Sequence, residues 1–297
     1  MSVDSATATG IGAVASVRRP AQRKTLRAIR RNKKALIGAT LLLILILVAL
    51  FAPILAPYDP NELGVGRPLT KPDSTHLLGT DNYGRDSFSR LVYGARISLL
   101  VAFGVIAGSI ALGVTTGLVT GYVGGIADYL VMRFIDILFT FPWALMSLAI
   151  AAILGPGLRT VLVALIIVYS PILARLTRSI VLGIREMEYI EAAQVVGLRS
   201  LTILWRYILP NSASAIIVQS TSIMGFSILA ESAISYVGLG TRPPTPSWGL
   251  SLSEGADYMW VAPHLVISPG LAIALMVLAL NLLGDGLRDV LDPRLRT

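Results

Sequence analysis

Few side chains in the apolar parts of this sequence could do chemistry, and Arg133 and Asp136 are the clearest pair. They stand three residues apart near the start of a charge-free stretch, so they occupy neighbouring positions on one helix face. Ionisable residues at membrane depth are functional candidates, and this pair could relay a proton or an ion. The alternative, which we favour, is a mutually neutralising ion pair at the cytoplasmic membrane interface, because no second buried carboxylate is expected to face it.

The polar connection between Arg175 and Arg206 contains the second candidate, the stretch from Glu186 to Gly197. It predicts a short helix with its acids toward the start, where the helix dipole favours negative charge. Gly197 allows a turn into a second short helix, from Ser200 to Tyr207. A helix–Gly–helix elbow suits docking of a soluble partner that pushes on the membrane helices. A solvated amphipathic loop is the alternative.

The sequence lacks the residues that most enzymes and metal sites require. It has no cysteine and two histidines, His76 and His264, so thiolate sites are excluded and a histidine-built metal or haem site is not expected. The patterns G-x-x-x-x-G-K-[ST], G-x-S-x-G and H-E-x-x-H are absent. We therefore expect a non-catalytic chain without a cofactor or metal, and any ATP hydrolysis must occur on another chain.

Composition indicates an integral membrane protein. Of the 297 residues 54% are hydrophobic and only 14% are charged, and the mean hydropathy is +0.72. Stretches free of charge that could each span the hydrocarbon core lie between these pairs of charged residues: Lys34–Asp59, Arg96–Asp128, Asp136–Arg159, Arg159–Arg175, Arg206–Glu231 and Asp257–Asp285. The sequence thus predicts an all-α protein with six transmembrane helices, of which the short fourth extends while Arg175 or Arg178 snorkels to the interface.

The net charge of +8 is explained by the positions of the basic residues. Nine Lys and Arg residues precede Ala35, more follow the fourth stretch, and Arg288, Arg294 and Arg296 lie near the C-terminus. The positive-inside rule places these segments in the cytoplasm, and six crossings put both termini there. The charge is therefore a topology signal, and we expect no nucleic-acid partner.

Glycine and proline positions indicate how the helices pack. A row of glycines in the second stretch has the spacing that lets two helices approach closely: Gly104, Gly108, Gly113, Gly117 and Gly121. Three prolines interrupt predicted spans, where they could kink the helix: Pro142, Pro171 and Pro269.

Three blocks of sequence resemble a known family. Glu191-Ala192-Ala193-x-x-x-Gly197, followed by Ile208-Leu209-Pro210, resembles the "EAA" loop of bacterial ATP-binding-cassette importer permeases. That loop usually has Ile three residues before the Pro, where this chain has Tyr207. Two further blocks, from Leu78 to Leu99 and from Gly238 to Arg294, resemble the C-type permease of dipeptide, oligopeptide and nickel importers.

The resemblance implies a type I importer permease fold in the bacterial inner membrane. It divides the chain into a basic cytoplasmic tail (1–34), a first transmembrane helix (35–57), a periplasmic connection (58–96) and a permease core (97–297) that contains the cytoplasmic coupling loop (176–206). The coupling residues it implies are Glu188, Glu191, Ala192, Ala193, Gly197 and Arg199.

The partners implied are a homologous B-type permease, one or two cytoplasmic ATPase subunits, a periplasmic or lipid-anchored binding protein, and membrane lipid. The solute would be a di- or oligopeptide or a related molecule such as a nickel chelate. A self-contained proton- or ion-coupled carrier is the main alternative, and it would require more buried carboxylates and an internal repeat. An intramembrane enzyme would require a Ser/His or paired-carboxylate site within the spans.

Overall fold

The computed structural model describes residues 32–291, so most of the basic tail predicted over residues 1–34, and Arg294 and Arg296, lie outside the described residues. Within residues 32–291 the regular structure is entirely helical. The elements are α2 (Lys33–Leu50), α3 (Ala52–Leu55), α4 (Ser87–Ser109), the π-helical turn η1 (Ile110–Val114), α5 (Thr115–Val123), α6 (Gly125–Thr140), α7 (Trp143–Leu154), α8 (Leu158–Arg185), α9 (Glu188–Val195), α10 (Ser200–Ile203), the π-helical turn η2 (Leu204–Ile208), α11 (Leu209–Tyr236), α12 (Trp248–Ala256) and α13 (His264–Leu291).

Five helices of the described part are long and apolar enough to cross a membrane: Lys33–Leu50, Ser87–Val123, Leu158–Arg185, Ser200–Tyr236 and His264–Leu291. A sixth crossing results if α6 and α7, which meet at an angle of 92°, are counted as one broken span. The bend lies at Pro142, whose ring cannot continue the helix of α6. Pro171 and Pro269, by contrast, lie inside the continuous helices α8 and α13.

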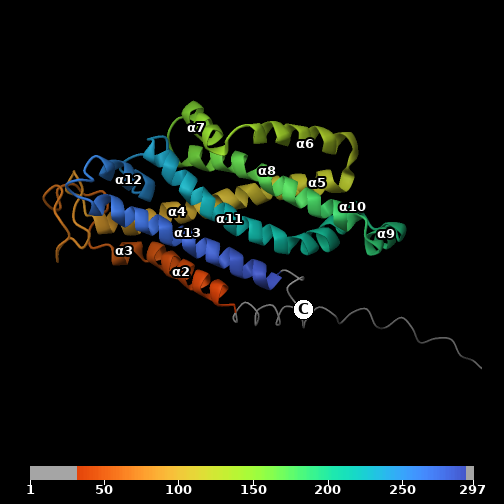
Figure 1. Cartoon of the computed structure of the whole chain (residues 1–297), viewed down its shortest axis with the longest axis horizontal. Helices are drawn as coiled ribbons and strands as arrows, with labels where there is room; N and C mark the ends of the chain where they lie inside the picture. The colour runs from red at the N-terminus through yellow and green to blue at the C-terminus, as the bar shows by residue number, and fades with distance from the viewer. Residues whose placement is uncertain (1–31, 292–297) are drawn as a thin grey trace, which may run out of the picture.

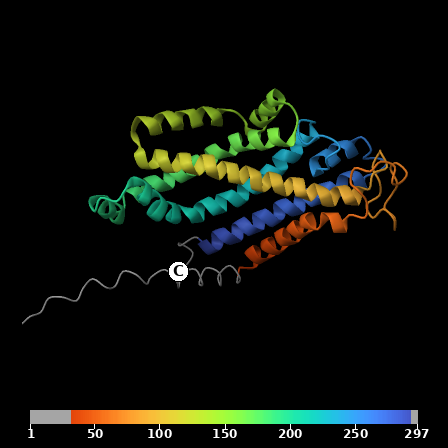
Figure 2. The ribbon, with the colours of Figure 1, turned by 180° about the vertical axis from the view of Figure 1, so that it is seen from behind.

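The long helices run side by side along one axis, and the polar connections gather at the two ends (Figure 1). At one end, called here the loop end, the connection of residues 56–86 packs with α12. At the other, the elbow end, α9 and α10 project from the bundle, as the reverse view also shows (Figure 2). Both α2 and α13 have their chain-terminal ends on the elbow side, where Lys34 Nζ lies 3.5 Å from an oxygen of Asp289.

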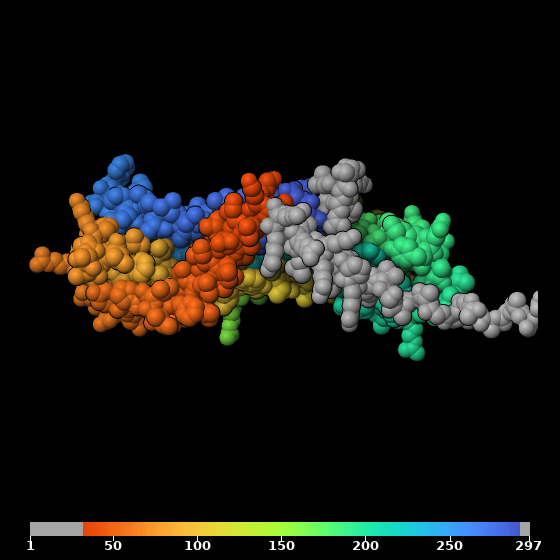
Figure 3. All heavy atoms as spheres, turned by 90° about the horizontal axis from the view of Figure 1, so that it is seen from below, coloured from red at the N-terminus to blue at the C-terminus, as the bar shows by residue number. Residues whose placement is uncertain are grey.

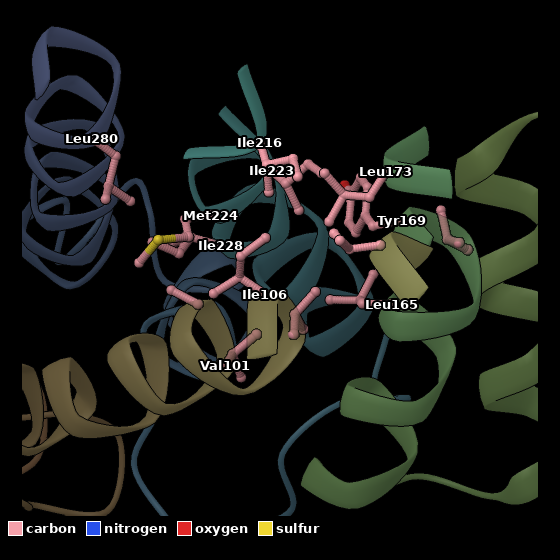
Figure 4. Close-up of a cluster of buried hydrophobic side chains, with 14 of the residues drawn as sticks. Val101, Ile106, Leu165, Tyr169, Leu173, Ile216, Ile223, Met224, Ile228 and Leu280 are labelled. Carbon is pink, nitrogen blue, oxygen red and sulfur yellow. The ribbon is translucent and has the colours of Figure 1, made fainter. Parts of the chain in front are cut away.

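The first helix, α2, packs on the outside of the bundle, mainly against α13 (Figure 3). Gly38 and Gly286 permit this contact, because a Cβ on either residue would collide with the backbone of the facing helix. The core itself forms where α4, α8, α11 and α13 meet, and Figure 4 labels some of its side chains. Ile223, Ile228 and Leu165 are among the fully buried residues there.

The glycine row forms the predicted close contact, and its partner is α8. A Cβ on Gly104 or Gly108 would collide with Leu162 or Ile166, and the three later glycines face the backbone or Cβ atoms of α8. The interval between Gly108 and Gly113 is one residue longer than the others. The π-helical turn η1 lies in this interval and accommodates the extra residue, which keeps all five glycines on one face.

The second crossing begins earlier than its charges suggest, because α4 starts at Ser87 rather than near Arg96. Arg96 donates from Nε to the carbonyl of Ala49 at 2.6 Å, and Arg90 is buried among partners described below. Charged residues that find such partners can be part of the helix. The predicted connection 58–96 is correspondingly shorter.

The third crossing also differs from the prediction, since α6 begins at Gly125 and carries both Asp128 and Asp136. The spacing of Arg133 and Asp136 predicts that they pair, but they do not. Asp136 pairs with Arg175 of α8, whose Nη2 lies 2.6 Å from its Oδ1, and Arg178 of α8 binds both carboxylate oxygens of Asp128 at 2.5 and 2.6 Å. These arginines therefore join α6 to α8 instead of snorkelling away from the bundle.

Candidate functional site: the elbow

The elbow (residues 186–208) leaves the end of α8 in a defined turn. Glu186 ends α8, and the N–H of Met187 donates to the carbonyl of Ile184 at 3.1 Å. Helix α9 follows, with Glu188 and Glu191 in its first turn, where the helix dipole favours negative charge. The predicted short helix is thus present at the expected place.

Gly197 ends α9 with a Schellman motif. Its φ is +82°, its N–H donates to the carbonyl of Gln194 at 2.9 Å, and the N–H of Leu198 donates to the carbonyl of Ala193 at 3.1 Å. A Cβ at Gly197 would meet no atom within 4 Å. Glycine is therefore required here for its backbone conformation and not for lack of space.

The elbow is fastened to the bundle by apolar side chains. Ile190 of α9 and Ile203 of α10 are fully buried, and both belong to the continuous core of the protein. The sequence predicts that the second short helix ends before Pro210, where the fifth crossing was expected to begin, but the helix does not end there. It continues through η2 into α11, with Ile208 fully buried, so that α10, η2 and α11 form one helix from Ser200 to Tyr236. A displacement of the elbow must therefore move α11.

The outward face of the elbow is apolar and uncovered. Val195 and Val196 are 88% and 79% exposed, and Leu201 and Trp205 are exposed by more than 60%. Exposed apolar groups rimmed by charges are typical of a surface that binds another protein. We call these four residues the elbow patch.

The sequence-predicted coupling residues surround this patch. Glu188, Glu191, Ala192, Gly197 and Arg199 are exposed, whereas Ala193 is buried against the bundle. Ala193 is thus a packing residue, and its carbonyl accepts the hydrogen bond that closes the Schellman motif. Tyr207, the departure from the family pattern, is half-buried, and its carbonyl accepts from Asn211 Nδ2 at 2.6 Å.

A second polar site lies at the loop end, and no function was predicted for it from the sequence. Four buried or nearly buried charged residues, called here the loop-end ion cluster, join the connection 56–86 to α4 and α12: Asp81, Arg85, Arg90 and Glu254. Arg85 Nε lies 2.5 Å from Asp81 Oδ2, while Arg85 and Arg90 both donate to Glu254 Oε2, at 2.8 and 3.1 Å. Asp81, Arg85 and Arg90 lie within the block from Leu78 to Leu99 that resembles the C-type permeases, and this resemblance was the signal in the sequence that could have pointed to the cluster.

Neighbouring contacts complete this cap. His76 Nδ1 lies 3.0 Å from Asp86 Oδ1, and the other oxygen of Asp86 caps α4 through the N–H of Ser89 at 2.8 Å. Trp248, at the start of α12, is buried, and its Nε1 donates to the carbonyl of Leu91 at 2.8 Å. Every charge of the cluster is paired, so the arrangement suits holding elements together rather than catalysis.

Glu231 was also placed wrongly, at the start of an outer connection. It lies inside α11, fully buried, and accepts a hydrogen bond from Ser235 Oγ at 2.7 Å. Among residues 32–291 no group of three or more acidic or histidine side chains is arranged to hold a metal ion. The polar sites of the described chain are therefore suited to packing and docking.

Comparisons with known proteins agree with the helical membrane fold described above. Residues 113–297 match the family model of the binding-protein-dependent transport system inner membrane component, and residues 22–74 match that of the N-terminal TM domain of oligopeptide transport permease C. The chain is 43% identical to the dipeptide transport system permease protein DppC of Alkalihalophilus pseudofirmus, over 93% of this chain and 90% of that protein. It is 45% identical to the glutathione transport system permease protein GsiD of Pectobacterium atrosepticum, over 95% and 94% of the two chains.

A solved structure of the MetNI methionine ABC transporter, in an inward-facing conformation, shares the fold. The TM-score is 0.54 at 20% identity, covering 68% of this chain and 96% of the other. The type I importer permease fold is thus confirmed, and permease subunits of this family are non-catalytic multi-pass membrane proteins that work with other subunits. The chain belongs to the binding-protein-dependent inner membrane components of ABC importers, as a C-type permease of the dipeptide, oligopeptide and nickel group.

Proposed function

We propose that this chain forms half of the translocation pathway of an ATP-driven peptide importer and receives the force of ATP hydrolysis through the elbow. Its solutes are di- or oligopeptides, or a related small solute such as a nickel chelate. The dipeptide and glutathione permeases to which it is similar support this class. A B-type permease supplies the other half, one or two ATPase subunits bind the elbow, and a periplasmic or lipid-anchored protein delivers the solute at the loop end.

The observation that carries the coupling role is the combination of an uncovered apolar face with a continuous mechanical connection. The elbow patch is available to a soluble partner, while buried Ile190 and Ile203 tie the same segment to the core. Because α10, η2 and α11 form one helix, a push on the patch reaches the interior of the bundle directly. We propose that the elbow and both chain termini lie in the cytoplasm, and the basic residues near them support this orientation.

The alternative of a self-contained carrier has less support. Such a carrier needs a carboxylate that is free to exchange a proton or cation. Asp128 and Asp136, the two carboxylates of α6, are each bound to an arginine of α8. The two carboxylates of α6 are therefore held in ion pairs and are not free relay groups, which leaves Glu231 as the single buried carboxylate of α11.

The test uses two substitutions of Gly197 in the fully assembled transporter. Gly197→Trp should lower solute uptake at least tenfold, because a bulky residue at φ +82° strains the turn and covers the docking face. Gly197→Asn is the matched control, since asparagine adopts this conformation with little strain, and it should retain most uptake. Both variants should insert into the membrane normally, and ATP hydrolysis in Gly197→Trp should no longer respond to the loaded binding protein. Unchanged uptake in Gly197→Trp would contradict the coupling role.

A further inference from the structure

Two cavities lie on either side of the contact between α8 and α11, and we call them together the α8–α11 groove. The first lies between the α6–α7 bend and α8, with Phe226 of α11 in its lining, and the second lies between α11 and α13, with Leu176 of α8 in its lining. The first, of about 430 Å³, is lined mainly by aromatic and apolar side chains that include Phe139, Trp143, Tyr169 and Phe226. The second, of about 410 Å³, has a mixed lining: Ser214, Gln219, Ser222 and Arg288 supply polar groups, and the other lining residues, Leu176, Ala215, Val218 and Leu291, are apolar. The first cavity is thus mainly apolar, and the second adds groups that can form hydrogen bonds.

The two cavities adjoin each other. On α8, Ile172 lines the first cavity and Leu176 lines the second. On α11, Phe226 lines the first and Ser222 the second. Residues four apart lie one turn apart on the same helix face, so the cavities form consecutive sections of one groove.

A charged pair lies beside the first cavity and contacts Phe139 of its lining. Arg175 lies on α8 between Ile172 and Leu176, its guanidinium carbon is 4.1 Å from the centre of the Phe139 ring, and its Nη2 binds Asp136 at 2.6 Å. Both side chains of the pair are about half exposed.

The depth of this pair argues against a surface covered by lipid. At about 1.5 Å per residue, Arg175 lies roughly 15 Å from the Arg185 end of α8, a helix roughly 42 Å long against a hydrocarbon core of about 30 Å. Charged side chains at such depth face a bundle interior or a water-filled cavity, because exposure to hydrocarbon is costly. The Asp136–Arg175 pair therefore indicates that this face of the isolated chain meets water or another protein in the membrane.

We infer that the α8–α11 groove is the surface of this chain along which the solute moves. The inference rests on the proposed importer function and names the pathway within it. The aromatic section takes the apolar side chains of a short peptide, Gln219 and Ser222 take its amide groups, and the Asp136–Arg175 pair offers opposite charges to its two ends. These three chemistries together match a short peptide with free termini better than a purely apolar or a purely ionic solute.

Single cysteines test the inference cleanly, because the chain has no cysteine of its own. Gln219→Cys and Ile217→Cys are compared in the assembled transporter in inside-out membrane vesicles, with a membrane-impermeant maleimide as the probe. The two positions lie about 3 Å apart in depth but about 200° apart around α11, and Ile217 is exposed on the other face. We expect Gln219→Cys to react at least tenfold faster, and its rate to fall at least fivefold when vanadate traps the ATPases.

Two other results would overturn the inference. If Gln219→Cys resists both the impermeant maleimide and lipid-soluble N-ethylmaleimide, another protein chain fills the groove. If it reacts only with N-ethylmaleimide, lipid covers the groove.

A blocking substitution separates this inference from the proposed function. Ser222→Trp should lower uptake of a labelled dipeptide at least tenfold while the ATPase subunits still co-purify, and Ile217→Trp should leave uptake within twofold of the unmodified chain. Normal uptake in Ser222→Trp would overturn the groove alone. Absence of ATP-driven uptake in the unmodified transporter would instead overturn the proposed function.

Discussion

The two ends of the molecule use their polar residues in opposite ways. At the loop end, Asp81, Arg85, Arg90 and Glu254 are all nearly buried and all paired, and they tie a long connection to two helices. At the elbow end, Glu188, Glu191 and Arg199 are exposed beside an uncovered apolar patch. The first arrangement is complete within the chain, whereas the second leaves apolar surface uncovered, which is typical of a surface that binds another protein. Changes at the loop end should therefore affect stability, and changes at the elbow should affect association.

The largest effect is expected for Asp81→Ala. Removal of one partner from a buried ion network leaves the guanidinium of Arg85 partly uncompensated, which should lower the free energy of unfolding by about 3 kcal/mol. Denaturation of the purified transporter by SDS in mixed micelles measures this change. Asp59→Ala is the control, since Asp59 is exposed and its side chain accepts from the nearby N–H of Asn61. Equal stability of the two variants would show that the cluster does not hold the loop end together.

Val196→Asp is the corresponding test at the elbow. Val196 is 79% exposed, so the substitution should leave the free energy of unfolding within about 0.5 kcal/mol. It puts a charge into an apolar docking surface, however, and should reduce co-purification of the ATPase subunits at least tenfold. Leu63→Asp, at a residue that is 67% exposed at the loop end, should leave co-purification unchanged. The contrast between the two ends fails if both variants retain the ATPase subunits.

A smaller effect is expected for Glu191→Lys. Glu191 lies at the rim of the patch, in the first turn of α9, where a positive charge opposes the helix dipole. Reversal of a rim charge should weaken ATPase binding about three- to tenfold, measured as the apparent Kd at two salt concentrations. The ATPase affinity of Glu191→Gln should lie between those of the unmodified chain and Glu191→Lys, and the differences in affinity should shrink at high salt. Affinity that does not change with charge at this position would place Glu191 outside the interface.

The smallest effect is expected for Lys34→Ala. Its ion pair with Asp289 joins α2 to α13, but the two side chains are 60% and 40% exposed. An exposed pair of this kind contributes about 0–1 kcal/mol, so the SDS denaturation midpoint should hardly change. A loss as large as that of Asp81→Ala would show that exposure does not distinguish the ion pairs of the two ends.

Local signals in the sequence were sufficient to predict helix α9 of the elbow and the turn at Gly197 that ends it. The acids at the start of α9 and Gly197 at its end act within a few residues, so the helix and the left-handed turn could be predicted without tertiary information. The glycine row likewise predicted a tight helix contact, although not that α8 would be the partner.

Pairing across long distances in the chain could not be predicted in this way. Asp136 has Arg133 three residues away but pairs with Arg175, because α6 folds back along α8. Arg90 pairs with Glu254, and this contact allows α4 to include a charged residue that sequence spacing placed in the preceding connection. The spacing of charges in one sequence describes neighbours on a helix but contains no information on which helices meet.

The π-helical turn η1 has a consequence for how the second crossing can change over evolutionary time. An extra residue in a helix would turn everything after it by about 100° away from its contact face. Here the extra residue is absorbed between Gly108 and Gly113, so the segments before and after it meet α8 in separate registers. The half near the loop end and the half near the elbow can therefore acquire insertions or shifts independently of each other.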